Sequence, residues 1–102
     1  MAIKLTKGTK EIVPVDVVDR TAVVTDLSTA SPKFWFQRDD NTYVYDNVAT
    51  TASGMRINPL VDASAAGPGG LLVNGHYRLF IGFTVGSEIV RLGPIDVQIL
   101  DT

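Results

Sequence analysis

The residues of this chain that could carry out acid–base or metal chemistry are few. His76 is the sole histidine, so no pair of imidazoles is present to bind a metal ion or relay a proton. There is no cysteine, which excludes disulfides, thiolate metal sites and cysteine nucleophiles. Alternation along the segment places Tyr77 in the core, so His76 faces outward or towards a neighbouring chain. The sequence favours an ordinary surface role for His76 over catalysis.

Three carboxylates, Asp39, Asp40 and Asp46, lie close together in the sequence and raise the alternatives of a calcium ion or glycosidase chemistry. Oxygen-rich turns supply calcium ligands, whereas glycosidase carboxylates need a cleft and a fixed separation. The run from Asp39 to Asn41 is typical of a turn, because Asp and Asn bond to their own backbone. A hairpin tip is convex, so we expect no catalytic pair here. A calcium ion at Asp39 and Asp40 stays open, and no other cofactor is expected.

Composition narrows the classes of protein further. The chain has 102 residues, of which 45% are hydrophobic and 20% charged, as in one folded globular domain. The net charge is −2 and the basic residues are scattered, which argues against a nucleic-acid partner. No apolar run of about 18 residues is present to span a membrane. The absence of cysteine fits assembly in a reducing cytosol. The N-terminal MAIKLTKG lacks the apolar stretch of a secretory signal.

Alternation of apolar residues with period two, together with many β-branched residues, predicts strands throughout. The expected strands are residues 2–6 (a first strand or an N-terminal arm), 10–18, 33–38, 42–48, 55–58, 75–85, 88–92 and 95–100. Pro14 cannot donate to a ladder, so 10–18 lies at an edge or carries a bulge, and Pro59 is expected to end 55–58. Residues 49–54 and 61–74 are expected to be loops, with a short helical turn at 62–66 as an option.

About seven strands separated by turn signals predict a single all-β domain. Because each strand has one apolar face, a second sheet must cover the first, which favours a β-sandwich over a barrel. We therefore divide the chain into an N-terminal arm or first strand at 1–9 and a β-sandwich domain at 10–102.

Alternation in the hairpin of residues 33–48 also predicts a surface. If Phe34 and Phe36 face the core, an aromatic cluster lies on the outer face: Trp35, Tyr43 and Tyr45. Such residues dominate the energetics of protein interfaces, so we predict a partner interface here. The alternative is that another strand or the N-terminal arm covers them.

Two further segments supply candidate interface residues. Leu71 and Leu72 follow a glycine-rich stretch, and they either pack over the open end of the sandwich or are offered to a partner. The N-terminal arm adds Ile3 and Leu5.

Several turn and strand motifs follow one another in a fixed order. They are the turn Asp26-Leu27-Ser28, the aromatic strand Phe34 to Asp40 with its acidic end, the turn Ser53-Gly54, the strand Gly75-His76-Tyr77-Arg78-Leu79, and the closing strand Pro94 to Ile99. In this order and spacing, residues 10–100 resemble the immunoglobulin-like β-sandwich modules of tailed bacteriophages, such as the N-terminal domain of baseplate upper proteins. The chain departs from that pattern in its longer segment from Val61 to Asn74 and in its extra MAIKLTKG.

The resemblance implies a non-enzymatic structural protein of the virion, assembled in the host cytoplasm. We expect a capsid decoration or cement protein that binds the major capsid protein or other virion proteins, with residues 1–9 and 61–74 reaching across subunit joints. Association between copies of the chain stays open. The alternatives are a tail or baseplate component, and a carbohydrate- or receptor-binding module that uses Trp35, Tyr43 and Tyr45 as a stacking platform.

Overall fold

The computed structural model describes residues 3–18 and 26–100, and this part of the chain forms strands and no helix. The strands are β1 (Ile3–Thr6), β2 (Lys10–Ile12), β3 (Val15–Asp16), β4 (Lys33–Arg38), β5 (Tyr43–Ala49), β6 (Thr51–Ser53), β7 (Arg56–Asn58), β8 (Leu60–Asp62), β9 (Gly75–Val85) and β10 (Glu88–Leu100). The predicted all-β class is confirmed. Within the same residues, no helix is long and apolar enough to cross a membrane.

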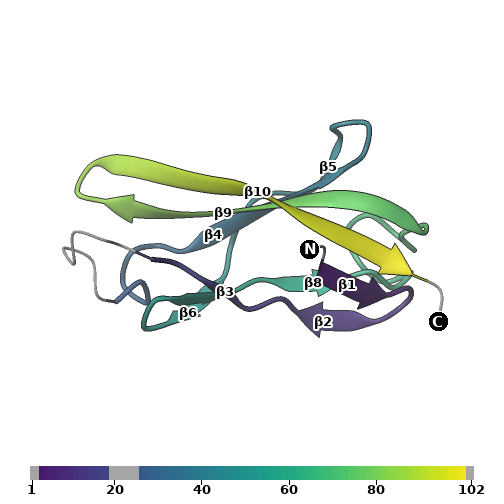
Figure 1. The fold of residues 1–102 in the computed structure, drawn as a ribbon, viewed down its shortest axis with the longest axis horizontal. Coiled ribbons are helices and arrows are strands. Elements are labelled where there is room, and N and C mark those ends of the chain that lie inside the picture. Colours follow the sequence, from purple (N-terminus) through teal and green to yellow (C-terminus); the bar gives the residue numbers. More distant parts are fainter. Residues whose placement is uncertain (1–2, 19–25, 101–102) are drawn as a thin grey trace.

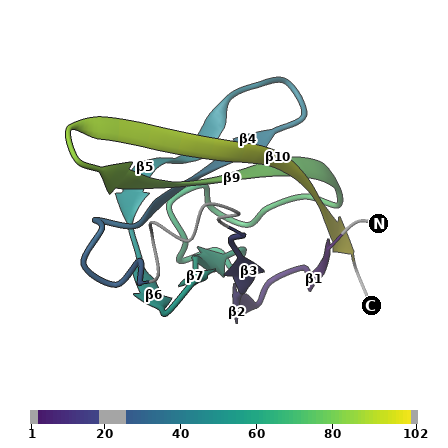
Figure 2. The same ribbon diagram turned by 60° about the vertical axis from the view of Figure 1, so that its left-hand side comes forward.

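The strands form two layers. A five-stranded sheet has the order β1-β10-β9-β4-β5, and two small sheets, β2-β8 and β3-β7-β6, make the opposite layer (Figure 1). Figure 2 shows β2, β3, β6 and β7 on the side opposite β9 and β10. Apolar side chains from both layers fill the space between them, including Phe34, Phe36, Leu79, Ile81, Val97 and Ile99 from the large sheet and Val13, Ile57 and Val61 from the small ones. The architecture is therefore a β-sandwich.

Two prolines interrupt a single ladder in the small layer. β2 pairs with β8 and β3 with β7 in one unbroken antiparallel register, with Ile12 opposite Leu60 and Val15 opposite Ile57. Between these pairs, the Val13 amide donates to the Pro59 carbonyl at 2.8 Å. Neither Pro14 nor Pro59 has an amide hydrogen to add to the ladder. Of the two alternatives for Pro14, the structure shows the edge position, because β2 and β3 each lie at the edge of their sheet and no bulge interrupts the register. β7 ends at Asn58, directly before Pro59, as predicted, and β8 begins directly after this proline.

The two predicted loops are partly strand. Within 49–54, residues Thr51–Ser53 form β6 and turn back onto β7 at Gly54, whose φ is +59°. Within 61–74, the chain first completes β8 and then makes two successive turns, in which Gly67 donates to the Ser64 carbonyl and Gly70 to the Gly67 carbonyl. No helical turn forms at 62–66. Instead, the Asp62 carboxylate accepts from the backbone amide and hydroxyl of Ser64, which favours a turn.

The C-terminal hairpin forms as predicted around Gly86-Ser87, but its second strand is longer than expected. Residues 88–92 and 95–100 belong to one strand, β10, with a shift of register between Leu92 and Ile95 at the Gly93-Pro94 bond. β1 pairs in parallel with the last four residues of β10. Of the two alternatives for residues 2–6, the structure therefore shows a strand of the sheet over Ile3–Thr6.

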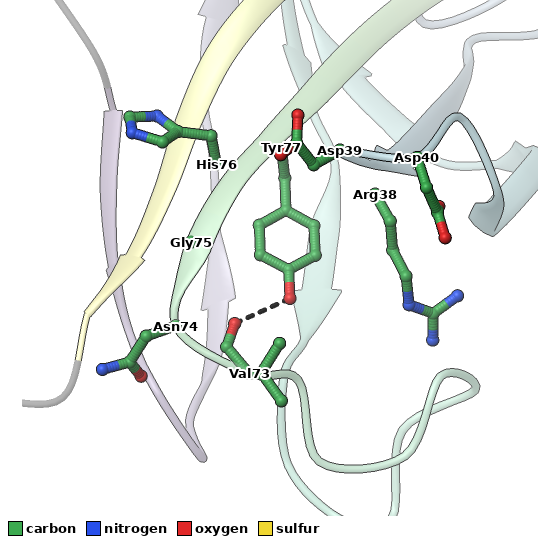
Figure 3. Close-up of a pocket in the computed structure, with 8 residues that line it drawn as sticks. All are labelled: Arg38, Asp39, Asp40, Val73, Asn74, Gly75, His76 and Tyr77. Carbon is green, nitrogen blue, oxygen red and sulfur yellow. Dashed lines mark hydrogen bonds between the residues drawn. The ribbon is translucent and has the colours of Figure 1, made fainter.

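Tyr77 fixes the connection into β9. Its ring is buried and stacks on Phe36 at 5.2 Å between centroids, as expected for a core residue. Its hydroxyl donates to the Val73 carbonyl at 2.7 Å, which ties the start of β9 to the preceding loop (Figure 3). Burial raises the pKa of Tyr77 above its usual value, so the hydroxyl keeps its proton and remains a donor.

Candidate partner-binding surface

The outer face of the five-stranded sheet carries a group of interacting side chains that belong neither to a turn nor to the core between the sheets. It consists of Trp35 from β4, Tyr43 from β5, Phe80 from β9 and Arg91 from β10, and we call it the arginine–aromatic cluster. Strand pairing brings these residues together. Trp35 lies opposite Phe80 on β9, and Arg91 lies opposite Gly82, two residues further along β9 and on the same face of the sheet. Four strands thus contribute one residue each to a single patch.

Arg91 is the centre of the arginine–aromatic cluster. Its guanidinium carbon lies 4.7 Å from the centroid of the Trp35 ring and 4.1 Å from that of Phe80. One of its nitrogens donates to the Tyr43 hydroxyl at 3.3 Å. A cation over aromatic faces is attracted by their negative π-surfaces, and a planar guanidinium is well suited to such stacking. The guanidinium is therefore held in place while the residue remains exposed to solvent.

Gly82 makes room for the tryptophan ring. A Cβ at this position would lie 2.7 Å from Cζ3 of Trp35 and 2.8 Å from the Val90 carbonyl oxygen. Glycine inside a strand often marks such a close approach to the backbone. The edge of the ring that carries Cζ3 therefore lies against Gly82 and Arg91 stands over the ring, so Trp35 keeps only 8% of its surface exposed.

The predicted outer-face position is thus right for Trp35 and Tyr43, and 40% of the Tyr43 surface is exposed. It is wrong for Tyr45, which belongs to the core. The Tyr45 ring lies 4.9 Å from that of Phe34, and its hydroxyl accepts from the Asp62 amide at 2.9 Å. Burial raises the pKa of Tyr45.

A bulge explains the error at Tyr45. Tyr43 pairs with Gln37 and Tyr45 with the adjacent Phe36, so Val44 is one extra residue on β5. An extra residue breaks the alternation of faces, and the two tyrosines therefore point to opposite sides of the sheet. The strand pattern in the sequence gives no sign of this insertion.

The remaining predicted interface residues also divide between surface and core. Leu71 is 52% exposed, whereas Leu72 is fully buried, as in the alternative that this segment packs over the end of the sandwich. Leu5 is a core residue, and Ile3 packs half-buried against the core. Leu5, Tyr45 and Leu72 are therefore not offered to a partner in this structure.

The two segments expected to reach outward lie against the sandwich over their described length. The Lys7 amide donates to the Leu100 carbonyl at 2.8 Å, which continues the pairing of β1. In the other segment, the Leu72 amide donates to the Ala63 carbonyl, and Arg38 donates to the Gly69 carbonyl. Residues 1–2 of the predicted arm lie outside the described residues.

A shallow hollow of about 400 Å³ lies beside the tip of the β4–β5 hairpin (Figure 3). It is lined by Arg38, Asp39, Asp40 and the segment 73–77. The Asp40 carboxylate accepts from the Thr42 hydroxyl at 2.7 Å and from its amide at 3.0 Å, and these bonds lower the pKa of Asp40. Among residues 3–18 and 26–100, no three His, Cys, Asp or Glu side chains gather as metal ligands would. Asp40 thus acts in the turn.

His76 lies at the other side of this hollow, on the outer face of β9. Its Nδ1 is 3.6 Å from a carboxylate oxygen of Asp96 on β10, and both side chains are more than half exposed. Figure 3 shows the imidazole pointing away from Arg38 and Asp40. The surface position predicted for His76 is confirmed.

Sequence reasoning missed Phe80 and Arg91, which complete the arginine–aromatic cluster. The available signal was Gly82, a small residue within the bulky alternation of residues 77–85. It indicates that something lies close to the backbone, although it does not say that a ring does so.

Comparison with known proteins adds no relative. No family model matches this sequence, and no curated protein matches it either. The functional interpretation therefore rests on the residues and their arrangement.

Proposed function

We propose that this protein is a non-enzymatic binding module with an immunoglobulin-like sandwich, and that it serves as a structural protein of a bacteriophage virion. The order of its strands supports the immunoglobulin-like assignment, with one sheet of β1-β10-β9-β4-β5 facing β2, β3, β6, β7 and β8. The Tyr77 hydroxyl bond to Val73 supports it too. Immunoglobulin-like domains carry a tyrosine corner of this kind at the start of their penultimate strand.

The observation that carries the proposal is the arginine–aromatic cluster. Arg91 is immobilised by two ring faces and by Tyr43 before any partner arrives, so little side-chain entropy is lost on binding. Arginine, tryptophan and tyrosine are the residue types that dominate interface energetics. The groups with shifted pKa values belong to turns, to a strand ladder or to the core, as Asp40, Asp16 and Tyr77 do.

The position in the particle is proposed from the sequence resemblance over residues 10–100. The protein decorates the assembled capsid and binds the major capsid protein through the outer face of the five-stranded sheet. A cement protein works by burying surface against two capsomers at once, so that expansion of the shell must break several contacts together. Affinity comes from a few anchors ringed by polar contacts, with Arg91 and Tyr43 as the leading ones.

The carbohydrate alternative has less support. A sugar-stacking platform needs open aromatic faces, but the Trp35 ring is covered by Arg91 and the Tyr45 ring lies in the core. Of the three rings on which that hypothesis depends, only Tyr43 is substantially exposed.

The test is co-sedimentation with phage heads that lack the protein, followed by calorimetry of the heads with and without it. We expect stoichiometric binding and a raised melting temperature of the heads. Arg91→Met, which keeps an apolar cover over Trp35, should weaken binding by roughly tenfold, as loss of one interface anchor does. Arg56→Met is the matched control, because Arg56 lies on the other layer and pairs with Asp16. Binding to tails alone would mean that the partner is a tail protein and not the major capsid protein. Binding to neither heads nor tails would overturn the proposal.

A further inference from the structure

One asparagine, in the loop before β9, is placed for a reaction with its own backbone. An asparagine side chain can cyclise with the amide nitrogen of the next residue, because the chain itself holds the two groups at the separation of a five-membered ring. The reaction needs a following residue that has an amide hydrogen and no bulky side chain. The four asparagines of the chain all lie among the described residues and differ in these respects: Asn41, Asn47, Asn58 and Asn74.

Two of the four asparagines lack a usable nucleophile. Asn58 is followed by Pro59, whose nitrogen carries no hydrogen and cannot form the ring. Asn47 is followed by Val48, which lies inside the β4–β5 ladder opposite Phe34. The branched side chain of Val48 also crowds the backbone on which the ring would form. Neither asparagine is therefore set up to cyclise.

Asn41 is held in the turn of the β4–β5 hairpin by hydrogen bonds on both of its reacting groups. Its side-chain oxygen accepts from the Arg78 guanidinium. The next amide, that of Thr42, donates to the Asp40 carboxylate at 3.0 Å. Bringing the Thr42 nitrogen to the side-chain carbon of Asn41 would break these bonds, so this asparagine is protected as well.

Asn74 meets each requirement. Its side chain is exposed at the rim of the hollow, and Figure 3 shows it pointing away from Tyr77, with no hydrogen bond to the other residues of that rim. Gly75 follows, and no atom lies within 4 Å of the position that a Cβ would take there. Gly75 is the first residue of β9 and pairs with Ile99 at the last position of the β9–β10 ladder. Because the end of a ladder opens at the lowest cost, the Gly75 amide can leave that pairing.

We propose that Asn74 is a site of spontaneous deamidation, at which the Gly75 amide nitrogen attacks the side-chain carbonyl carbon of Asn74. A bond forms between this nitrogen and this carbon, the carbon–nitrogen bond of the side-chain amide breaks, and ammonia leaves with the proton of the Gly75 amide. Water then opens the cyclic imide at either of its two carbonyl carbons. One opening gives aspartate, and the other gives isoaspartate, in which the main chain runs through the former side chain. The reaction does not depend on the proposed function.

The products change two features of the segment before β9. Both add a carboxylate to a hollow that Asp39 and Asp40 already line. Isoaspartate also lengthens the main chain by one methylene between Val73, whose carbonyl accepts from the Tyr77 hydroxyl, and the first residue of β9. We therefore expect the isoaspartate form to unfold at a lower temperature than the aspartate form.

The experiment incubates the full chain at neutral and at mildly alkaline pH, digests it with trypsin and locates the products by mass spectrometry. Cleavage after Arg56 and Arg78 releases one peptide that carries both Asn58 and Asn74, so Asn58 is an internal control. We expect the gain of about 1 Da at Asn74, with both isoaspartate and aspartate among the products. Conversion should be several-fold faster at the higher pH, because the attacking nitrogen must lose its proton. A sample digested without incubation corrects for conversion during digestion.

The outcomes that would overturn the proposal are distinct. Conversion at Asn74 no faster than at Asn58, or conversion to aspartate alone, would exclude the cyclic route. Conversion only in urea would mean that the folded loop protects the site. Asn74→Gln lengthens the side chain and disfavours the ring, so it should stay unconverted over the same period.

The effect on β9 is measured separately by circular dichroism during heating. The isoaspartate form is purified from the incubated chain, and Asn74→Asp supplies the aspartate form. We expect the isoaspartate form to melt at the lower temperature. Equal melting temperatures would show that the added methylene does not disturb the start of β9 and would overturn that part of the inference.

Discussion

At the scale of the residue, Gly82 determines whether the arginine–aromatic cluster can form. Gly82→Ala places a methyl group 2.7 Å from the Trp35 ring and 2.8 Å from the Val90 carbonyl, and both neighbours must shift. We expect a loss of roughly 1–3 kcal/mol in the free energy of unfolding. Because Trp35 is the sole tryptophan, its fluorescence should also shift to longer wavelength as the ring leaves its covered position. Urea unfolding followed by this emission measures both effects.

Gly54→Asn is the control for this substitution. Gly54 has φ +59° and no atom within 4 Å of its would-be Cβ, and asparagine tolerates that conformation. It should therefore change stability little. A Gly82→Ala protein with unchanged emission and unchanged stability would show that Trp35 does not lie against this backbone.

A second residue-scale prediction concerns the hydroxyl of Tyr77. Tyr77→Phe keeps the ring that stacks on Phe36 but removes the 2.7 Å bond to the Val73 carbonyl. We expect a loss of about 1 kcal/mol in chemical denaturation. Tyr43→Phe is the matched control, since the Tyr43 side chain is substantially exposed and its hydroxyl accepts an exposed hydrogen bond from Arg91. Equal losses in the two variants would mean that the Tyr77 hydroxyl has no special role in anchoring β9.

At the scale of the element, the sequence predicts most long strands well, although it divides β10 in two, and it predicts short strands poorly. β4, β9 and the hairpin turn at Gly86-Ser87 follow from alternation and turn chemistry, and the structure has them at the expected residues. β6 is three small or polar residues, so its apolar pattern is too short to detect, and it exists because β7 is there to pair with it. Likewise, the bulge at Val44 arises from pairing across strands, which periodicity along one strand does not encode.

The candidate surface was predictable to the same extent. Alternation alone places Trp35 and Tyr43 on one face. Trp35 lies within the regular strand β4, and Tyr43 lies directly after the turn and before the bulge at Val44. Arg91 joins them only through the order of strands β10-β9-β4-β5. Such a contact between distant segments depends on topology, which the residues of any one strand do not specify.

A prediction at this scale tests whether β1 is a structural strand. Leu5 on β1 is 6% exposed and packs in the core, so Leu5→Ala should lower the free energy of unfolding by about 2 kcal/mol or more. Ile12→Ala on β2 removes a similar side chain that is 59% exposed, and it should cost under about 0.5 kcal/mol. Circular dichroism during thermal unfolding compares the two. A Leu5→Ala protein as stable as the Ile12→Ala protein would mean that residues 1–9 behave as a free arm.

At the scale of the whole molecule, the two layers depend on polar turns as well as on the apolar core. The described chain has no polar or charged residue among its buried ones, so the core imposes no pH dependence through buried carboxylates. The carboxylates with shifted pKa values instead lie in turns and at a strand edge: Asp16, Asp26, Asp40 and Asp62. Each accepts hydrogen bonds that stabilise its charged form. Acid should therefore loosen the connections of the sandwich before it affects the core.

The resulting acid sensitivity has a definite sign. The Ser64 hydroxyl and amide lower the pKa of Asp62 below its ordinary value of 3.8. The unfolded chain then binds a proton at a higher pH than the folded chain does, so unfolding takes up protons in this range. The stabilisation is fully present above the unfolded pKa and is lost as the pH falls through the folded pKa. Urea unfolding should give a constant free energy between about pH 5 and 7 and a decline below about pH 4.

Two variants assign part of that decline to the turn at Asp62. Asp62→Asn keeps an oxygen acceptor for Ser64 but does not titrate, so its stability should fall less steeply with acid than that of the wild type. Ser64→Ala removes the hydroxyl that contributes most to the lowered pKa, and it should reduce the acid slope while lowering stability at pH 7. Because the Asp62 carboxylate is still partly solvated, each change of slope is small and needs paired titrations at several pH values. Identical acid slopes in the wild type and both variants would place the acid-sensitive stabilisation at the other three carboxylates, and would show that the Asp62 turn does not couple to folding.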